Sequence, residues 1–253
     1  MHIAKGIEML EISVPVMGGI DTFYPALIWD EEGAILIDTG VPGAEQKFKQ
    51  AAAEASVPLS HVRTILITHQ DIDHIGSLPA LLEQSQSTIT VLAHEIERPY
   101  IEGDKMLLKH TPDALAAAEA MLPPSVPEEW KRAFLHVLAH PPKGRVDQTL
   151  TGGEYLPIGG GITIIHTPGH SPGHLSLYHH TSRTLIAADA LTVRDGQLYG
   201  PDATATPDML TALQSLHKFA DWEIDQVICY HGGLYRGDVN RRIEELAQAQ
   251  GTH

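Results

Sequence analysis

Residues 62–76 join a short apolar segment to a dense cluster of histidines and carboxylates, and this feature limits the possible folds most strongly. The segment 62–67 is rich in β-branched residues, which predicts a buried strand. Open α/β sheets keep their binding sites at the carboxyl ends of their strands, so the polar cluster is expected at such an edge. A helical pattern follows over 78–84, with Ser77 as candidate N-cap. Directly after the strand lie four side chains that can bind a metal: His69, Asp71, Asp73 and His74.

The spacing of these four side chains divides them into two pairs. His69 and Asp71 alternate with Gln70, so both can point the same way from an extended backbone. Asp73 and His74 are adjacent and lie at the entrance to the helix. Two pairs at slightly different places indicate two metal ions. The alternative is that Asp71 or Asp73 only caps the following helix.

The charge balance excludes several classes of partner. The chain has 17 Lys and Arg against 32 Asp and Glu, a formal net charge of −15. This balance argues against nucleic acid, whose binding depends on cations that neutralise phosphates, and against an anionic membrane surface. The sequence has neither an apolar run long enough to span a membrane nor a recognisable signal peptide over residues 1–8, so a cytoplasmic protein is expected. The single Cys229 lies in an apolar segment and is expected to be an inert core thiol.

The hydrophobic pattern predicts one large domain over residues 1–253 that mixes strands and helices. Helices are expected over 43–55, 207–219 and 238–248. Strands are expected over 7–14 and 22–29 (joined by a Gly18-Gly19 turn), 34–37, 89–93, 154–158, 162–166, 174–178, 184–187 and 226–229.

Two halves of the chain repeat one order of elements. In each half a strand ends in an aspartate, Asp38 or Asp189, and a helix follows. A second strand then ends in a histidine, His69 or His231. The repeat predicts two sheets packed together with helices on the outside, so that the ligand-bearing strand ends meet. The strand 162–166 adds Thr167-Pro-Gly-His170, a turn in which glycine permits a positive φ.

Residues 94–144 interrupt this pattern and are predicted to form a helical insertion with helices over 112–122 and 127–139. The insertion is expected to decide substrate preference by covering the site, or to offer the contact face of a homodimer. Six apolar side chains are candidates for a substrate pocket or for packing between the two helices: Met106, Leu107, Met121, Leu122, Trp130 and Phe134. Four histidines are assigned to the surface or to packing: His94, His110, His136 and His140.

The motifs His69-x-Asp71-x-Asp73-His74, Thr167-Pro-Gly-His170, Asp189 and His231 resemble, in this order, those of the metallo-β-lactamase superfamily. The resemblance covers nearly the whole chain, and Asp38-Thr39-Gly40 fits the early Asp-x-Gly turn of that family. It implies a four-layer αβ/βα sandwich with a two-metal site in the cleft along its edge.

The resemblance also implies how the metal ligands are divided. One ion would take His69, Asp71 and His170, while the other would take Asp73, His74 and His231, with Asp189 bridging both. His174 matches a position that is usually not a ligand, and four histidines are expected to be structural or to support the ligands: His166, His174, His179 and His180.

Asp71 departs from the usual His-x-His-x-Asp-His pattern of the family. The flavodiiron proteins, a branch of the superfamily that resembles this chain here, carry a carboxylate at this position and bind iron. Two divalent zinc ions are the leading expectation, and the hard anionic oxygen of Asp71 makes iron or manganese the alternatives. With Asp71 the charges of the ions, the carboxylates and a bridging hydroxide cancel, which predicts a weaker Lewis acid and a somewhat alkaline activity optimum.

A metal pair of this kind lowers the pKa of bound water to about 7. The expected reaction is therefore attack of a metal-bridging hydroxide on a small cyclic ester or amide, such as a lactone or β-lactam, or on a related ester or thioester. Asp73 is the expected catalytic residue, because it can carry a proton to the leaving group. The expected partner is a small-molecule substrate.

Within the family the sequence looks most like the N-acyl homoserine lactonases, which commonly have a tyrosine where this chain has Thr192. Tyr24, Tyr199 or Tyr230 could act in its place or could simply pack. A hydroxyacylglutathione thioesterase is less expected, because the long carboxyl-terminal helical domain typical of those enzymes is not recognised. The alternatives are a promiscuous β-lactamase or esterase, an iron-binding oxidoreductase of the same fold, and a metal-stabilised binding protein without turnover.

Overall fold

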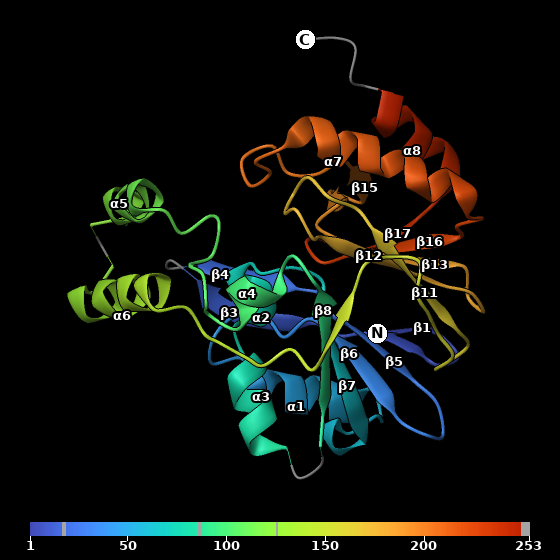
Figure 1. Cartoon of the computed structure of the whole chain (residues 1–253), viewed down its shortest axis with the longest axis horizontal. Coiled ribbons are helices and arrows are strands. Elements are labelled where there is room, and N and C mark those ends of the chain that lie inside the picture. Colours follow the sequence, from blue (N-terminus) through green and yellow to red (C-terminus); the bar gives the residue numbers. More distant parts are fainter. Residues whose placement is uncertain (17–18, 86–87, 125, 249–253) are drawn as a thin grey trace.

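Two β-sheets pack face to face, and helices cover the outer face of each, so that the layers run helix, sheet, sheet, helix (Figure 1). The computed structural model describes residues 1–16, 19–85, 88–124 and 126–248. This order of layers confirms the four-layer sandwich that the sequence predicts, because each sheet must bury one face on its partner and the other under helices.

The first sheet contains seven strands in the order β1-β2-β5-β6-β7-β8-β9. They are β1 (His2–Ala4), β2 (Ile7–Met9), β5 (Ala26–Trp29), β6 (Ala34–Ile37), β7 (Val62–Ile67), β8 (Thr90–His94) and β9 (Gln148–Leu150). The second sheet contains six strands in the order β10-β11-β12-β13-β16-β17. They are β10 (Tyr155–Leu156), β11 (Ile162–His166), β12 (Leu175–His179), β13 (Thr184–Ala188), β16 (Gln226–Cys229) and β17 (Gly233–Arg236). Two hairpins stand apart: β3 (Ile12–Val16) with β4 (Gly19–Phe23), and β14 (Thr192–Arg194) with β15 (Gln197–Tyr199).

The helices fall into three sets. Those of the first half are α1 (Glu45–Glu54), α2 (Ile72–Ile75) and α3 (Leu78–Gln84), with a 3₁₀ turn at Leu59–His61. The insertion carries α4 (Arg98–Ile101), α5 (Pro112–Met121) and α6 (Glu128–Ala139), of which α5 and α6 stand at one side of the sandwich (Figure 1). The second half ends in α7 (Met209–Leu216), a 3₁₀ segment at His217–Asp221, and α8 (Val239–Gln248).

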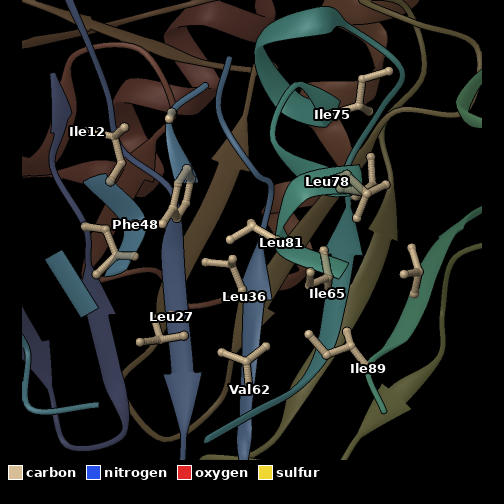
Figure 2. Close-up of a cluster of buried hydrophobic side chains, with 14 of the residues drawn as sticks. Ile12, Leu27, Leu36, Phe48, Val62, Ile65, Ile75, Leu78, Leu81 and Ile89 are labelled. Atoms are coloured by element: carbon tan, nitrogen blue, oxygen red, sulfur yellow. The ribbon is translucent and has the colours of Figure 1, made fainter. Parts of the chain in front are cut away.

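The buried apolar side chains form three clusters, one under the helices of the first half, one between the two sheets and one under the helices of the second half. Figure 2 shows the layer under the first helices, where Phe48 of α1 and Leu81 of α3 pack with Leu36 and Ile65 of the sheet. A second layer lies between the sheets and includes Ile35, Leu66 and Leu177, and a third lies under α7 and α8. Successive strand residues thus point to opposite faces, as the pleat requires. Burying one such side chain completely stabilises the folded chain by roughly 1.5–3 kcal/mol.

Most predicted elements are present, with two clear corrections near the amino terminus. The predicted strand 7–14 is divided into β2 and β3, and the predicted strand 22–29 into β4 and β5. Pro25 has no N–H to donate, and it lies where the pair β3–β4 leaves the first sheet. Of the predicted turn, Gly18 lies outside the described residues, and Gly19 belongs to β4.

Smaller differences from the predicted elements concern one helix end and several short elements. The predicted helix 207–219 is α7 followed by a 3₁₀ segment. The sequence did not predict the short elements α2, α4, β1, β9, β14, β15 and β17 or the 3₁₀ turn at Leu59–His61. Ser77 does lie at the N-cap position of α3, but it makes no capping bond; its hydroxyl donates to the Val41 carbonyl at 2.7 Å. Cys229 is buried in β16, which confirms the predicted core position, and burial raises the pKa of its thiol well above the usual value. Among the described residues, no helix has the length and hydropathy needed to cross a bilayer.

Candidate metal centre

Strands that run in the same direction bring all seven predicted ligands to one edge of the sandwich. In the first sheet β6, β7 and β8 are mutually parallel, so their carboxyl ends share one edge. In the second sheet β13 and β16 are parallel, and β11 runs the same way because two antiparallel pairings separate it from β13. A backbone hydrogen bond joins the two edges: the Leu175 N–H donates to the Thr68 carbonyl oxygen at 3.0 Å. The predicted ligands therefore converge although they are far apart in sequence.

The first group of possible ligands consists of His69, Asp71, His170 and Asp189. The Nε2 atom of His170 lies 3.1 Å from Asp71 Oδ2 and 3.2 Å from Asp189 Oδ2. The Nε2 atom of His69 lies 3.4 Å from Asp71 Oδ2 and 3.9 Å from Asp189 Oδ2. Four donor atoms thus surround one point, as a metal site requires.

The second group consists of Asp73, His74 and His231. Asp73 Oδ2 lies 3.3 Å from His231 Nε2 and 3.8 Å from His74 Nε2. Asp189 reaches this group too, because its carboxylate lies 3.5 Å from the Nε2 atoms of both His74 and His231. The carboxylate of Asp189 therefore stands between the two groups, where the resemblance places a bridging ligand.

Unpaired buried atoms indicate that these groups suit a metal ion. The Nε2 atoms of His69 and His74 and the Oδ1 atom of Asp189 are buried and make no hydrogen bond. A buried polar atom without a partner costs about 1–3 kcal/mol, so such atoms call for a bound partner. Imidazole nitrogens and carboxylate oxygens together suit zinc, iron and manganese. The residues present therefore fit a divalent cation.

Hydrogen bonds behind the ligands fix which ring nitrogen faces the centre. His74 Nδ1 lies 2.8 Å from the buried carboxylate of Asp38, which also accepts from the Thr68 backbone N–H. His69 Nδ1 contacts the Thr68 hydroxyl at 3.0 Å, and His170 Nδ1 contacts Thr206 at 3.2 Å. With Nδ1 occupied, Nε2 is left to face the centre, which is the usual arrangement of ligating histidines.

Opposite charges dominate the protonation of the second group. Burial opposes ionisation of Asp189, but His231, His74 and His170 outweigh it and hold the pKa of Asp189 well below its usual value. Burial likewise opposes protonation of His231, yet the carboxylates of Asp189 and Asp73 raise the pKa of His231 to about 10. At neutral pH both ring nitrogens of His231 are therefore protonated in the metal-free chain. A metal ion that binds Nε2 must displace the proton on that atom.

Glu97 supports the candidate centre and was not predicted from the sequence. Its buried carboxylate accepts four hydrogen bonds from the two loops that carry first-group ligands. Gln70 donates to Glu97 Oε2 through its backbone N–H at 3.0 Å and its side chain at 2.7 Å. Ser171 and the Gly173 N–H donate to Oε1 at 2.8 and 2.7 Å. Glu97 follows the predicted strand 89–93 closely, so the rule that found the ligands could have found it.

Lys109 is the second residue that the sequence analysis missed. Its ammonium contacts Asp71 Oδ2 at 2.5 Å and His170 Nε2 at 2.7 Å. Nothing in the local sequence signals this contact, because it depends on the path of the insertion. The charge balance expected from the sequence did not include this cation. Its positive charge offsets the negative charge of Asp71, which was expected to weaken the metal ions as Lewis acids.

The remaining histidines take the supporting roles that the sequence predicts. His174 is buried, accepts from the Asp189 N–H at 3.1 Å and contacts Thr167 Oγ1 at 2.8 Å, so it holds the backbone of a ligand. His166, His179 and His180 bond to backbone or hydroxyl groups elsewhere. Of the four histidines in the insertion none belongs to a ligand group, and His94 is fully packed, stacked on His166 at 4.3 Å.

The three tyrosines considered in place of Thr192 take other roles. The Tyr230 hydroxyl donates to the Asp73 backbone carbonyl at 2.5 Å, and its ring lies 3.9 Å from the ring of His74. Tyr199 is exposed near Arg242. Tyr24 donates its backbone N–H to the Tyr230 carbonyl, and its ring packs near Gly233. The Thr192 hydroxyl donates to the Gly200 carbonyl at 3.2 Å, and its side chain lines the polar pocket described below.

Gly169, directly before His170, has a backbone conformation and a close contact that only glycine allows. Its φ is +133°, and a Cβ there would lie 2.2 Å from the backbone nitrogen of Ala212 in α7. We expect Gly169→Ala to lower the free energy of unfolding by ~3 kcal/mol, from clash and strain together. Gly196→Ala is the control, because Gly196 has a φ of +71° but open space around its Cβ. Equal losses in urea unfolding of the two variants would contradict the clash.

Two pockets meet at the second ligand group. A polar pocket of about 370 Å³ is lined by Asp71, Asp189 and Arg194, among others. An apolar pocket of about 440 Å³ lies between the hairpin β3–β4, with Phe23, and α6, with Trp130 and Phe134. Of the six apolar candidates in the insertion only these last two line it: Leu107 and Leu122 are buried, while Met106 and Met121 are exposed. Asp73 and His231 line both pockets.

The fold and the clustered donors together define a class of metal-binding hydrolases. The metallo-β-lactamase superfamily model matches residues 25–231, and the chain belongs to this superfamily. Among curated relatives, the "Probable metallo-hydrolase YflN" of Bacillus subtilis (strain 168) is 29% identical over 240 residues, covering 90% of this chain and 84% of that protein. The "Hydroxyacylglutathione hydrolase GloC" of Haemophilus influenzae is 28% identical over 169 residues, covering 66% of this chain and 65% of that protein.

Solved structures agree with this assignment. A metallo-β-lactamase family protein from Thermus thermophilus superposes with a TM-score of 0.67 at 25% identity, covering 96% of this chain and 79% of that one. A metallo-β-lactamase from Pontibacter korlensis has the same TM-score at 16% identity, covering 99% and 98%, and shows the shared fold.

Proposed function

We propose that this chain is a hydrolase with two metal ions that cleaves a small cyclic ester or amide, or a related ester or thioester, next to an apolar group. The position of Asp73 and His231 carries the proposal, because these two residues line both the polar and the apolar pocket. A substrate whose apolar part fills the pocket at α6 would present its acyl bond to the second ligand group. A small molecule of this kind is the partner that both pockets suit.

The ligand groups and Asp73 would divide the chemistry. Divalent ions at these groups would polarise the acyl carbonyl and make hydroxide available near neutral pH. Asp73 has the most accessible of the three carboxylates: its side chain is 24% exposed, against 15% for Asp71 and 8% for Asp189. An exposed oxygen beside the reacting bond can carry a proton to the leaving group, so Asp73 is proposed as the catalytic residue. Zinc is the proposed metal, and the hard oxygen of Asp71 makes iron or manganese the alternatives.

The relatives support the class of bond. YflN is named a probable metallo-hydrolase, and GloC is named a hydroxyacylglutathione hydrolase. A thioester therefore stands beside the lactone in the proposal, although the sequence pattern favours a lactone. The apolar lining from Phe23, Trp130 and Phe134 favours an acyl chain or another apolar substituent over a charged one.

A direct experiment tests the proposal. The metal content of purified protein is measured, and metal-depleted protein reloaded with zinc, iron or manganese is assayed on chromogenic lactones, esters, thioesters and nitrocefin. We expect close to two ions per chain and turnover only in loaded protein. Bound metal with no turnover of any substrate would point to a metal-stabilised binding protein, and iron without hydrolysis would point to an oxidoreductase.

The apolar pocket gives a specificity prediction. We expect Phe134→Ala to raise KM about tenfold for substrates with a long acyl chain, about 1.4 kcal/mol of binding, with kcat nearly unchanged. The expected effect on short-chain substrates is small, because they do not reach Phe134. Met121→Ala removes an exposed side chain of the same insertion and serves as control. An equal rise in KM for short and long substrates would contradict the placement of the acyl chain.

Asp71 gives a prediction on metal preference. Asp71→His replaces a hard oxygen by a borderline nitrogen, so we expect the share of zinc in the bound metal to rise and that of iron or manganese to fall. Elemental analysis of both proteins, purified from medium with equal amounts of the three metals, measures this. An unchanged metal content and an unchanged pH profile would show that the residue at 71 does not tune the centre.

A further inference from the structure

A lysine ammonium lies inside the first ligand group. Lys109 Nζ contacts two of that group's four donor atoms, Asp71 Oδ2 at 2.5 Å and His170 Nε2 at 2.7 Å. The Lys109 side chain is only 24% exposed. A cation therefore already takes up the oxygen and nitrogen that a metal ion would bind.

The position of Lys109 is fixed by the loop that carries the ligands. The Leu108 N–H donates to the Gln70 side-chain oxygen at 2.7 Å, and Gln70 lies between His69 and Asp71. Gln70 is held in turn by Glu97 through two hydrogen bonds. The backbone beside Lys109 is thus attached to the first group, and the lysine does not reach it by chance from a free surface.

Among the described residues, no lysine or arginine forms an ion pair with the second ligand group. In the described part of the chain, Asp73 forms ion pairs only with the histidines of its own group, His74 and His231. The two groups share Asp189 but differ in this one respect. An ion entering the first group must displace the Lys109 ammonium, whereas an ion entering the second group meets no lysine or arginine contact from the residues that the structure describes.

We infer that Lys109 is an internal cation that competes with metal for the first ligand group, so that the second group fills first. The inference rests on the metal centre proposed above. A charge-assisted hydrogen bond is among the stronger polar interactions of proteins, and the entering ion must break the contact to Asp71 Oδ2. Lys109 also offsets the charge of Asp71 beside Asp189 and so holds the first group together in the metal-free chain.

Titration of metal-depleted protein with Zn²⁺ in a calorimeter tests the competition. We expect the wild type to bind two ions with clearly different affinities. In Lys109→Met the weaker of the two sites should bind about tenfold tighter or more, since no ammonium has to be displaced. Lys109→Arg keeps a cation and should retain the weak site. Lys105→Met removes a lysine of the same insertion, which lies over the Tyr100 ring, and should leave both affinities unchanged.

Thermal unfolding gives a second readout. Metal-free Lys109→Met should unfold at a lower temperature than the metal-free wild type, because Asp71 and Asp189 then repel each other without a cation. Saturating Zn²⁺ should abolish this difference in Tm, so the metal-induced rise in Tm is larger in the variant. A merely structural lysine would instead lower the Tm equally with and without metal.

Two results would overturn the inference while leaving the proposed hydrolase intact: unchanged or weaker binding at both sites in Lys109→Met, or equal behaviour of the Met and Arg variants. A wild type that binds no ion, with no change in Lys109→Met, would overturn both the inference and the proposed function. Two binding sites with unequal affinities in the wild type and nearly equal affinities in Lys109→Met would support the inference.

Discussion

Asp189→Ala is expected to leave the chain unable to hold two metal ions and to reduce hydrolysis about a thousandfold. Among the carboxylates of the described residues, only that of Asp189 pairs with histidines of both ligand groups, at 3.2 Å from His170 and 3.5 Å from His74 and His231. Without it each group loses its shared anion, and the positive charge of two ions loses part of its balance. Elemental analysis and kcat/KM measure the two effects.

Asp202→Ala is the matched control for this variant. Asp202 lines the same polar pocket and pairs with Arg194, but it belongs to neither ligand group. We expect this control to keep its full metal content. Should Asp189→Ala also keep two ions per chain, Asp189 would not bridge the groups, and the division of ligands would have to be redrawn.

Glu97→Ala is expected to lower both the free energy of unfolding and the affinity for metal ions. Its removal leaves the backbone N–H groups of Gln70 and Gly173 and the side chains of Gln70 and Ser171 without their acceptor. Each buried donor left unpaired costs about 1–3 kcal/mol, so we expect a total loss of ~4 kcal/mol after water enters. The loops bearing Asp71 and His170 would loosen, which should weaken metal binding about ten- to a hundredfold.

Urea unfolding of metal-free protein and Zn²⁺ titration separate these two effects. Glu119→Ala, at an exposed position of α5, is the control and should change neither. Glu97→Gln should be intermediate, since its amide keeps one acceptor oxygen but turns a donor toward other donors. A Glu97→Ala protein with lowered stability but unchanged metal affinity would make Glu97 a structural residue only.

Several features of this protein could be predicted because they depend on neighbours along the chain. The strand β7 has the predicted bounds, since its apolar run rich in β-branched residues and the polar residues that follow it are local. The seven candidate ligands were found by one rule, that a polar residue directly after a strand lies at the edge of a sheet. The repeat of strand, Asp, helix, strand and His indicated the two halves, and the order of layers followed from it.

Other features escaped prediction because no local pattern encodes them. Lys109 reaches two candidate ligands from the insertion, and the apolar pocket forms only where α6 meets the hairpin β3–β4. The apolar residues of the insertion are similar in type, yet Trp130 and Phe134 line the pocket while Met121 is exposed. The division of two predicted strands near Pro25 also depends on where the sheet ends.

The sequence by itself determined which side chains end the strands, and so the set of possible metal ligands and the family. Only the tertiary structure decided which of them meet: Asp71 and His170 are 99 positions apart, and the Tyr230 hydroxyl reaches the Asp73 carbonyl across 157. The reason is physical. Strand and turn preferences act over a few residues, whereas the distance between two strand ends is set by how whole sheets bury their apolar faces against each other.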